Sequence, residues 1–356
     1  MPPRSAPGLP TINDVAREAG VSRATAARVL GGYGPASEQA RERVLATAAK
    51  LRYRPNTLAR GIRSGRTRTL GLVISDIQLA FFSQTVREIA DTAHEAGFEV
   101  ILMNTDEDVA AERAAVGVLV DKRVDGILIA LADPTDTAHL QEAQERGIPV
   151  VLFDRGSSGY DAVVTDNVKA AHDAVSHLVG LGHSRIAIVV EGQTALSAAE
   201  LMTSRLASDN GMPSRLRLIG WASALQEAGV PVSDELILRS QYDRDGARRV
   251  SAEALRSATP PTAIVTTDET MTLGVLVAVR ELDLDIPADV SLVSFDDLPW
   301  TTIVQPPLTV VAQPLQEIGA TAARQLLQRI ETVDKLPHTI VLRTRLELRG
   351  STGPVA

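Results

Sequence analysis

Apolar residues recur at helical spacing in the first part of the chain. They return every three or four positions in two stretches before residue 54, as on one face of a short helix. Thr11, with Asp14 three positions later, forms a variant capping box, and Ser22 and Ser37 can cap two more helices. The third helix is expected to turn inward Ala40, Val44, Leu45, Ala48 and Leu51. The pattern therefore predicts three short helices over residues 11–54.

From Thr69 onward, short apolar strands alternate with helical stretches. The predicted strands are Leu70–Ser75, Glu99–Met103, Gly126–Ala130, Pro149–Phe153, Ala162–Thr165, Ile186–Val190, Ala263–Thr266 and Ser291–Phe295. The predicted helices include Ser83–Ala96, Asn167–Leu181, Leu216–Ala228 and Thr270–Leu282. Such alternation is typical of parallel sheets covered by helices on both faces. Residues 69–356 exceed what one core comfortably supports, so we predict an α/β fold with two doubly wound parallel-sheet lobes and a ligand cleft between them.

A short polar stretch links these two parts. Pro55 interrupts the helical pattern, Asn56 can cap a helix over Thr57–Arg63, and Gly65 ends it. A helix this short is unstable alone in water, so we expect it to form only against a partner. The predicted organisation is a disordered tail at 1–10, an all-α head at 11–54, a hinge helix and linker at 55–68, and a two-lobed domain at 69–356.

Charge is distributed unevenly along the chain. The 356 residues carry a net charge of −8, yet residues 1–68 hold 13 lysines and arginines against 4 acidic residues, and the rest holds 23 against 40. A basic segment attached to an acidic body is typical of a module that binds a polyanion such as DNA. With 44% hydrophobic and 22% charged residues, the chain is expected to be a packed globular protein.

Composition also excludes several classes of protein. Because there are no cysteines, disulfides, thiolate catalysis and cysteine-ligated metal sites are excluded. No apolar run approaches the roughly 18 residues of a transmembrane helix. The first ten residues contain four prolines and no apolar core of a secretory signal, so we expect a cytoplasmic protein.

Residues 11–30 fit a helix-turn-helix. A small alanine lets two helices approach, Gly20 makes the sharp turn, and Val21 fills the corner. The second helix then projects Arg23 and Arg28 outward, where arginine can donate two hydrogen bonds to guanine in the major groove. Together with the basic charge, this spacing predicts DNA binding rather than a plain helical hairpin.

Several segments resemble those of one family of regulators. They are TINDVAREAGVSRATAARVL at 11–30, LRYRPNTLARGIR at 51–63, SHLVGLGH at 176–183, FDD at 295–297 and PPLT at 306–309. As a set, they make the chain similar to the LacI/GalR family of transcriptional regulators. The resemblance implies a repressor with a helix-turn-helix head, a hinge helix and a periplasmic-binding-protein-like body. It also implies a homodimer, or a tetramer, on double-stranded operator DNA that is pseudo-palindromic.

The resemblance assigns roles in DNA binding. Arg23 and Ala24 stand at the family's most sequence-discriminating positions, and Arg28 stands at that of its usual base-reading arginine. The DNA-binding residues implied are Thr11, Ser22, Arg23, Ala24, Thr25, Arg28, Tyr53, Asn56, Ala59, Arg60, Ile62 and Arg63.

Three positions depart from the family pattern. Ile62 stands where the family usually has a leucine that wedges into the minor groove and kinks the duplex. Ala27 and Gly31 replace a customary serine and asparagine, which removes two phosphate contacts. Arg60 and Arg63 are the candidates to compensate.

Polar and aromatic side chains follow the predicted strands at their carboxyl ends, where parallel sheets bind ligands. Carboxylates and arginines can bind vicinal hydroxyls in pairs, while aromatic faces pack on the C–H surface of a sugar. The candidate effector-binding residues are Asp76, Phe81, Phe82, Asp154, Arg155, Arg217, Thr267, Asp296 and Gln313. Asp76 and Arg155 rest on the strand pattern alone, and Thr267 stands where the family has asparagine. The others match ligand-binding positions of the family.

Three alternatives stay open at this point. Arg155 can bridge the lobes, or it can bind a carboxylate or phosphate of the ligand. Residues 192–214 form a longer segment than their family counterpart, and they can lie over the cleft or reach a partner. A sugar or sugar derivative is the expected effector, acting as an inducer or as a co-repressor.

The sequence offers no convincing catalytic site, cofactor loop or metal site, so we expect neither an enzyme nor a cofactor. His94-Glu95 is followed by Phe98 where a zinc-binding helix needs histidine, and all six histidines are expected at the surface or at helix caps. Ser75-Asp76-Ile77 replaces the glycine-rich loop of a dinucleotide site. A sugar-transport receptor and a sugar-acting enzyme are therefore disfavoured, and a transcriptional activator is the main alternative.

Overall fold

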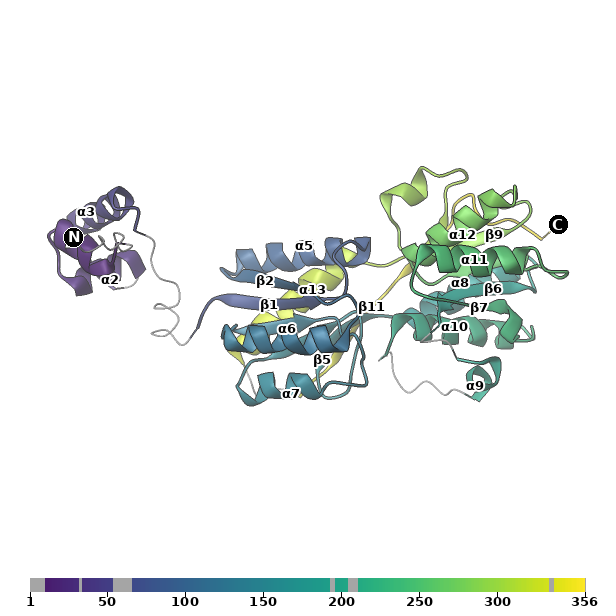
Figure 1. Ribbon diagram of the computed structural model, residues 1–356, viewed down its shortest axis with the longest axis horizontal. Coiled ribbons are helices and arrows are strands. Elements are labelled where there is room, and N and C mark those ends of the chain that lie inside the picture. Colours follow the sequence, from purple (N-terminus) through teal and green to yellow (C-terminus); the bar gives the residue numbers. More distant parts are fainter. Residues whose placement is uncertain are drawn as a thin grey trace, which may run out of the picture. The chain divides into compact units, whose positions relative to one another are not determined.

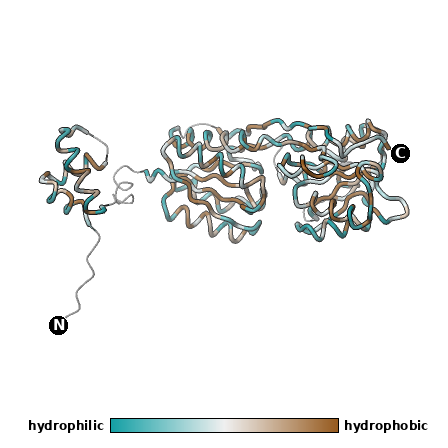
Figure 2. The backbone as a smooth tube through the Cα atoms, turned by 90° about the horizontal axis from the view of Figure 1, so that it is seen from above, coloured by the Kyte–Doolittle hydropathy of each residue, from teal (hydrophilic) through white to brown (hydrophobic). Residues whose placement is uncertain are grey.

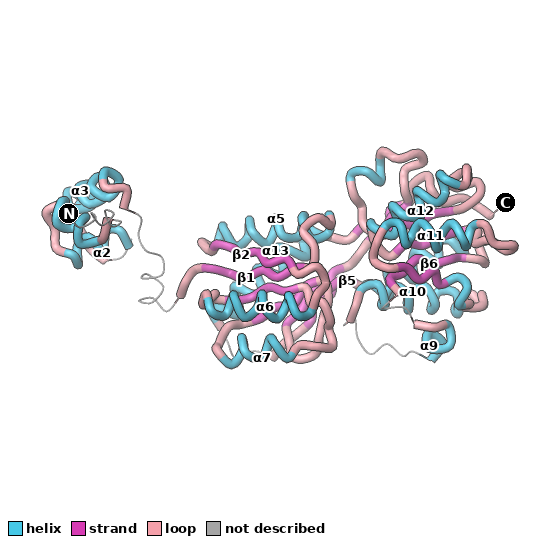
Figure 3. Tube along the Cα trace, in the orientation of Figure 1, coloured by secondary structure: helices cyan, strands magenta, loops and turns pink. Residues whose placement is uncertain are grey.

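The computed structural model describes residues 10–31, 34–53, 66–192, 196–203, 211–332 and 336–355. Contacts between residues divide the chain into two units, Met1–Arg68 and Thr69–Ala356 (Figure 1). The first unit is helical where it is described, whereas the second combines strands and helices (Figure 3). Most of the predicted tail and of the predicted hinge helix lies outside the described residues.

The first unit contains the three predicted helices. They are α1 (Ile12–Glu18), α2 (Arg23–Gly31) and α3 (Glu38–Lys50). Thr11 and Asp14 form the predicted capping box, in which the Thr11 N–H donates to Asp14 Oδ2 at 2.9 Å. The Ser22 hydroxyl accepts a hydrogen bond from the Thr25 N–H at 3.1 Å, and Ser37 caps α3 in the same way. Each helix therefore begins at a side chain that satisfies its unpaired N–H groups.

A small apolar core holds the three helices together. Its buried members are Val15, Ala16, Ala19, Ala26, Val29, Val44 and Ala48. Gly20 has φ +62°, a left-handed conformation that glycine adopts without strain and that turns the chain between α1 and α2. One inward prediction is wrong, since the Leu45 side chain is 49% exposed. Val44, which is fully buried, already occupies this face of α3.

The first lobe is built on a six-stranded sheet in which every pair of neighbours runs parallel, in the order β11-β5-β4-β3-β1-β2. Its strands are β1 (Thr69–Ile74), β2 (Glu99–Asn104), β3 (Gly126–Ile129), β4 (Val150–Phe153), β5 (Asp161–Thr165) and β11 (Thr339–Leu342). Its helices are α5 (Ala80–Glu95), α6 (Val109–Asp121), α7 (Ala138–Glu145) and α13 (Leu315–Glu331).

Helices cover both faces of this first sheet. Leu70 and Leu72 belong to the core shared with α5 and α13, whereas Val73 belongs to the core shared with α6 and α7. This division follows from the strand geometry, because successive side chains of a strand point to opposite faces. The near-continuous apolar strands of the sequence therefore reflect burial on both sides.

The second lobe has a six-stranded sheet in the order β12-β10-β9-β8-β6-β7, in which β12 runs antiparallel to β10. Its strands are β6 (Ile186–Glu191), β7 (Ile237–Ser240), β8 (Ala263–Thr266), β9 (Ser291–Phe295), β10 (Thr309–Ala312) and β12 (Arg345–Glu347). Its helices are α8 (Asn167–Gly180), α9 (Ala198–Thr203), α10 (Pro213–Glu227), α11 (Arg244–Leu255) and α12 (Glu269–Glu281), with 3-10 turns at Asp234–Leu236 and Pro299–Thr302.

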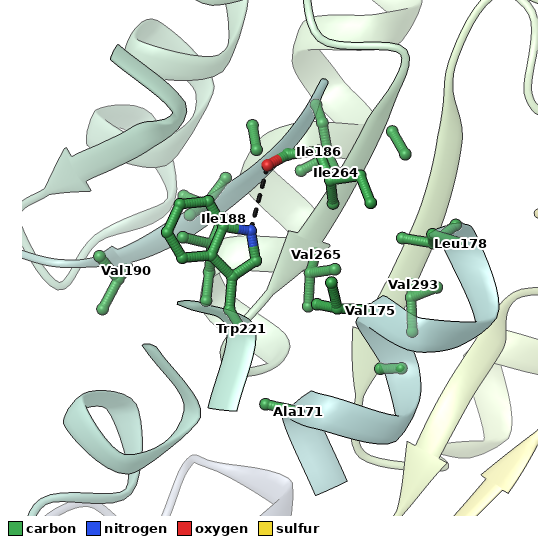
Figure 4. Close-up of a cluster of buried hydrophobic side chains, with 14 of the residues drawn as sticks. Ala171, Val175, Leu178, Ile186, Ile188, Val190, Trp221, Ile264, Val265 and Val293 are labelled. Atoms are coloured by element: carbon green, nitrogen blue, oxygen red, sulfur yellow. Dashed lines mark hydrogen bonds between the residues drawn. The ribbon is translucent and has the colours of Figure 1, made fainter. Parts of the chain in front are cut away.

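Trp221 on α10 anchors the core of the second lobe. Its indole is fully buried among apolar side chains of the sheet and of α8, and its Nε1 donates to the Ile186 carbonyl at 3.1 Å (Figure 4). The preceding Gly220 lets α10 approach α8 closely, because a Cβ there would lie 2.1 Å from the Val168 carbonyl oxygen. This packing fixes α10, the helix that carries one of the predicted effector residues.

The structure bears out the predicted strands and helices with small shifts at their ends. The eight predicted strands are all present, and their ends differ by at most one residue. The four predicted helices are present as well, with starts up to three residues earlier than predicted. The strand pattern missed β7, β10, β11 and β12, which are short or lie at sheet edges.

The chain passes between the two lobes three times. It leaves the first lobe after β5, returns from β10 to α13, and leaves again between β11 and β12. Each lobe is therefore assembled from stretches that are far apart in sequence. In both lobes, the hydrophobic residues run along the interior strands (Figure 2).

None of the helices in the described part of the chain combines the length and the apolar character that crossing a lipid bilayer requires.

Candidate functional site

One cavity, named here the interlobe cavity, is lined by residues of both lobes. The first lobe contributes Leu79, Phe81, Phe82, Glu107, Asp154 and Arg155. The second lobe contributes Glu191, Met212, Pro213, Ser214, Arg217, Tyr242, Thr267, Asp268, Glu269, Asp296 and Gln313. Most of these residues follow the carboxyl end of a strand, which is where open parallel sheets bind ligands.

Of the nine predicted effector-binding residues, all but Asp76 line this cavity. Asp76 follows β1, but its Oδ1 accepts a hydrogen bond from the Gln78 N–H at 2.8 Å. An aspartate that bonds the backbone two residues later stabilises a local turn. The structure gives this carboxylate a role in the turn that leads into α5, and its role in binding the effector stays a prediction.

The two phenylalanines form an aromatic wall at the start of α5. The rings of Phe81 and Phe82 meet edge to face with centroids 5.1 Å apart, and Phe82 meets the buried Phe153 in the same manner at 6.3 Å. Phe82 is 3% exposed and belongs to the core of the first lobe. Because the wall is anchored in that core, it offers a ligand a rigid apolar surface.

Arg217 is held in place by fixed partners of the second lobe. Its Nε donates to Asn167 Oδ1 at 2.8 Å, and its Nη1 donates to the Thr267 carbonyl. The guanidinium carbon lies 4.1 Å from the centroid of the Phe295 ring. These contacts use two of its five N–H groups, so further donors can bind a ligand from a fixed position.

A hydrogen-bonded chain connects the first lobe to Asp296. Thr165, at the end of β5, donates to Gln313 Oε1 at 3.1 Å, and Gln313 Nε2 donates to Asp296 Oδ1 at 2.6 Å. Asp154 and Asp296 both adopt positive φ, at 65° and 74°, directly after a strand. Burial raises the pKa of each carboxyl, and the charge of Arg217 opposes that rise in both.

Arg155 already has its full complement of acidic partners. Its Nη1 and Nη2 each donate to a Glu107 oxygen at 2.6 Å, Nη1 also donates to the Leu131 carbonyl at 2.6 Å, and Nε lies 3.3 Å from Asp154 Oδ2. Burial alone would lower its pKa, but the hydrogen bonds and charge of Glu107 raise the pKa above its ordinary value. All these partners belong to the first lobe. The described contacts of Arg155 therefore lie within the first lobe.

Sequence reasoning missed several polar residues of the cavity. They are Glu107, Glu191, Tyr242 and Glu269. Asp268, which lies beside the predicted Thr267 after β8, was noticed as a strand-end residue and also lines the cavity, and Glu269 follows it, so its position was a usable signal. Tyr242 follows β7, a strand that the pattern did not predict. Met212, Pro213 and Ser214, at the end of the long 192–214 segment, also line the cavity, which places that end at the cleft.

In the head, the predicted base-reading surface lies at the start of α2. Ser22, Arg23 and Ala24 are exposed, whereas Thr25 and Arg28 are half-buried. Arg28 makes long contacts of 3.4 Å from Nε to the Ala24 carbonyl and from Nη2 to the Thr25 hydroxyl. Such weak contacts leave the guanidinium available for another acceptor.

The other predicted DNA contacts divide into two groups. Thr11 is exposed at the start of α1, and Tyr53 is half-buried against the core of the head. The hinge predictions lie outside the described residues: Asn56, Ala59, Arg60, Ile62 and Arg63.

Comparisons with known proteins decide the family. A model of the bacterial regulatory proteins of the lacI family matches residues 11–56, and a periplasmic binding protein-like domain model matches residues 175–352. Catabolite control protein A of Priestia megaterium is 35% identical over 350 residues, which cover 96% of this chain and 99% of that protein. The chain belongs to the LacI family. It is therefore a DNA-binding transcriptional regulator, and the prediction that it is not an enzyme is confirmed.

Solved structures of LacI family proteins have the same fold. A lac repressor dimer bound to operator and an anti-inducer matches with a TM-score of 0.83 at 26% identity, covering 97% of this chain and all of that one. A LacI family regulator from Enterococcus faecium with bound ribose matches with a TM-score of 0.68 at 30% identity, covering 81% of this chain and all of that one. The predicted head and two parallel-sheet lobes are thus confirmed as a LacI-like fold.

Two histidines of this LacI family chain are not at the surface as predicted. His139 Nε2 lies 2.8 Å from Glu112 Oε1, and both side chains are nearly or fully buried, at 6% and 0% exposure. His183 is 3% exposed and bonds the Thr262 hydroxyl at 2.9 Å and the Gly353 carbonyl at 3.0 Å. The ring nitrogens of His183 are satisfied by these partners, which are distant in sequence, whereas His139 only lies close to the buried Glu112 carboxylate. Within the described ranges, no group of three or more potential ligands has the geometry of a metal site.

The carboxyl group of Asp268 should make the stability of this regulator pH-dependent. Burial raises the pKa of Asp268 from its ordinary 3.8 to about 6, although the Met271 N–H and Arg217 oppose the rise. The folded protein thus keeps this proton to a higher pH than the unfolded chain does. Stability is therefore lost as the pH rises from about 4 to about 6, and the loss persists above that range.

Asp268→Asn tests this expectation in the absence of effector. Asparagine can still accept the Met271 N–H that Oδ1 now accepts at 2.9 Å, but it cannot ionise. We expect the variant to be more stable than the wild type by about 3 kcal/mol at pH 8, with the difference vanishing near pH 4. Urea unfolding across this pH range measures it, with Asp108→Asn, at another helix start, as the matched control. A difference that does not depend on pH would contradict the assignment.

Proposed function

We propose that this chain is a homodimeric transcriptional repressor whose affinity for its operator is switched by a sugar bound in the interlobe cavity. One observation carries the proposal: the chain joins a helix-turn-helix head to a cavity lined by fixed carboxylates, two arginines and an aromatic wall. The lac repressor relative is a dimer bound to operator, and the Enterococcus faecium relative binds ribose. Because the target is chromosomal DNA, the cytoplasm is the proposed location.

The proposed ligand chemistry follows from the fixed polar groups. Asp154 and Asp296 can accept hydrogen bonds from vicinal hydroxyls, and Arg217 can donate to the same ligand, because all three line one cavity. The rings of Phe81 and Phe82 offer the apolar surface on which the C–H face of a sugar packs. Thr267, whose hydroxyl bonds the Val189 carbonyl at 3.1 Å, acts mainly through its backbone, which holds Arg217.

The proposed switch acts through residues 55–68, which we assign to the hinge helix and linker. The cavity is lined from both lobes, so a bound ligand changes the preferred relation of one lobe to the other. In a dimer, this change determines whether the two hinge segments can pack against each other. Since a short helix is marginal alone, a coupling of about 1–3 kcal/mol suffices to order or melt it.

Operator selection from a pool of random duplexes tests the proposal. We expect the full-length dimer to enrich a pseudo-palindromic sequence, and its affinity for that sequence to change by roughly 5–150-fold when the effector sugar is added. A thermal-shift screen of sugars identifies that effector first, because ligand binding stabilises the folded state. A protein that enriches no palindrome under any ligand condition would rule the proposal out.

Arg28→Ala should relax sequence discrimination without abolishing DNA binding. An arginine that reads guanine contributes about 1–3 kcal/mol of discrimination. We therefore expect affinity for the selected operator to fall by about 10–100-fold while affinity for random duplex changes little. Fluorescence anisotropy with both duplexes at one salt concentration measures the two affinities. Arg52→Ala, an exposed arginine of the head outside α2, is the control. Equal losses on both duplexes would show that Arg28 contacts phosphate and not bases.

Activation is the alternative within the family. The same DNA-binding and effector-binding residues serve an activator, so the position of the selected operator relative to the promoter discriminates between the two roles.

A further inference from the structure

We propose that the interlobe cavity selects uncharged, hydroxyl-rich ligands against phosphorylated or carboxylated ones, and that Glu107 sets this preference by neutralising Arg155. The inference deepens the proposed function, because it names the charge class of the effector in the same cavity. It also assigns a role to a residue that the strand pattern did not single out.

The first step is the commitment of Arg155. Glu107 accepts from both terminal nitrogens at 2.6 Å, and the Leu131 carbonyl and Asp154 take two more N–H groups. Four of the five guanidinium N–H groups are therefore used. The guanidinium side chain is 8% exposed. A phosphate or carboxylate that approached it would have to displace Glu107 from a bidentate pair, the strongest geometry available to an arginine.

The second step concerns Arg217, the other cationic residue of the cavity. Among the described residues, acceptors take up only two of its five N–H groups, so it can bind a ligand oxygen. However, Asp154, Asp268 and Asp296 all act electrostatically on Arg217. A ligand hydroxyl oxygen can accept a hydrogen bond from Arg217 without electrostatic repulsion. An anion at the same place is repelled by the three carboxylates.

The balance of charge in the lining points the same way. Six acidic side chains line the cavity, namely Glu107, Asp154, Glu191, Asp268, Glu269 and Asp296, against the two arginines. An uncharged polyol can donate its hydroxyl hydrogens to such acceptors. A phosphate ester brings further hydrogen-bond acceptors and negative charge. It therefore finds few donors in the lining and is repelled by the acidic side chains.

The backbone around Glu107 indicates that its position is imposed by the fold. Asp106 and Glu107 both have positive φ, at 52° and 61°, which is uncommon for residues other than glycine. Backbone bonds fasten the turn on both sides, from Asp106 N to the Ser75 carbonyl at 2.7 Å and from Asp108 N to the Thr105 carbonyl at 2.9 Å. Residues that the surrounding structure holds in a left-handed conformation are common at ligand sites, where the strained backbone fixes the position of a functional side chain.

A plain structural ion pair is the competing explanation, and inorganic phosphate distinguishes the two. The test compares the wild type with Glu107→Gln, which leaves the two terminal nitrogens of Arg155 only neutral acceptors. Glu99→Gln is the matched control, because it removes the same charge from an exposed position at the other end of β2. Adding Arg155→Met to Glu107→Gln tests whether any new binding depends on the released arginine.

Phosphate binding is measured on the full-length protein by calorimetry and by the melting temperature, at pH 7.5 and with potassium chloride at matched ionic strength. We expect Glu107→Gln to bind phosphate at least tenfold more tightly than the wild type. Glu99→Gln and the double variant should resemble the wild type, and weak binding by the basic head cancels because it is common to all. If Glu107→Gln lowers the melting temperature in chloride, Glu107→Ala provides a second way to release Arg155 from its carboxylate partner and to measure phosphate binding.

Two outcomes would overturn the inference. One is equal phosphate affinity in the wild type and in both Glu107 variants. The other is tight phosphate binding by the wild type that Arg155→Met abolishes, since Arg155 would then be an anion ligand already.

A second pair of probes keeps this inference separate from the proposed function. D-ribose and D-ribose 5-phosphate are titrated into the wild type and into Glu107→Gln. We expect the wild type to favour ribose by at least tenfold, and Glu107→Gln to reduce that ratio. A wild type that favours the phosphate ester contradicts the charge selection. If neither ribose compound binds, the choice of this sugar is wrong, while the phosphate comparison still decides the role of Glu107.

Discussion

Asp296→Asn should weaken binding of the effector sugar at least 100-fold while leaving operator affinity in the absence of effector unchanged. The Asp296 side chain lines the interlobe cavity, and the residue is 4% exposed. A hydrogen bond to a charged acceptor contributes about 1.5–3 kcal/mol, and the loss of a carboxylate that binds two hydroxyls reaches the upper part of that range. Asparagine tolerates the positive φ of 74° at this position, so the backbone should stay as it is.

Calorimetry with the sugar found in the screen, followed by operator titration of the same protein sample, measures both quantities. Asp297→Asn is the matched control, because the neighbouring carboxylate points to Arg349 Nη2, at 2.6 Å, and does not line the cavity. An Asp296→Asn protein with normal sugar affinity would place the effector elsewhere and refute the assignment of the cavity.

Asp161→Ala should destabilise the two-lobed unit by about 3–5 kcal/mol, because it removes one partner of a buried ion pair. Asp161 and Arg329 are 5% and 7% exposed, and Asp161 Oδ2 lies 2.6 Å from Arg329 Nε. The same carboxylate accepts hydrogen bonds from Gln325 Nε2 at 3.2 Å and from the His338 N–H at 3.1 Å. One side chain of β5 thus fastens both α13 and the start of β11.

Urea unfolding of the wild type and the variant gives the difference in stability. The double variant Asp161→Ala/Arg329→Met should recover much of the loss, since it removes both members of the buried pair. Asp91→Ala, which breaks an exposed ion pair with Arg87 on α5, should leave the midpoint nearly unchanged. A small effect of Asp161→Ala alone would mean that Arg329 finds water or another acceptor.

The sequence predicts the buried strands well because each is an uninterrupted apolar run between polar breaks. β11 was not predicted, since it lies at the sheet edge and its residues alternate between exposed and half-buried. Leu45 shows the opposite error, because helical spacing identifies a face without telling how far the partner helices extend over it. Such limits are set by tertiary packing, which local pattern does not contain.

The candidate site was predictable where a strand end and a family position coincide. Asp154, Asp296 and Gln313 are of this kind, and all line the cavity. Asp76 also follows a strand end, but its carboxylate hydrogen-bonds within the local turn and is not among the side chains that line the cavity. The Glu107–Arg155 pair joins residues 48 positions apart, and only the fold brings them together.

The order in which the chain is made has a consequence for how this regulator reaches its native state. While residues 166–312 leave the ribosome, the first lobe still lacks its edge strand β11 and the helix α13 that covers one face of its sheet. The apolar side chains of β3, β4 and β5 that pack against α13, among them Leu128, Val151 and Val163, stay open to water throughout this interval. A nascent chain that stalls before α13 therefore exposes an apolar sheet face that is prone to aggregate. We expect chaperones to bind this face until the final 40 or so residues have been made.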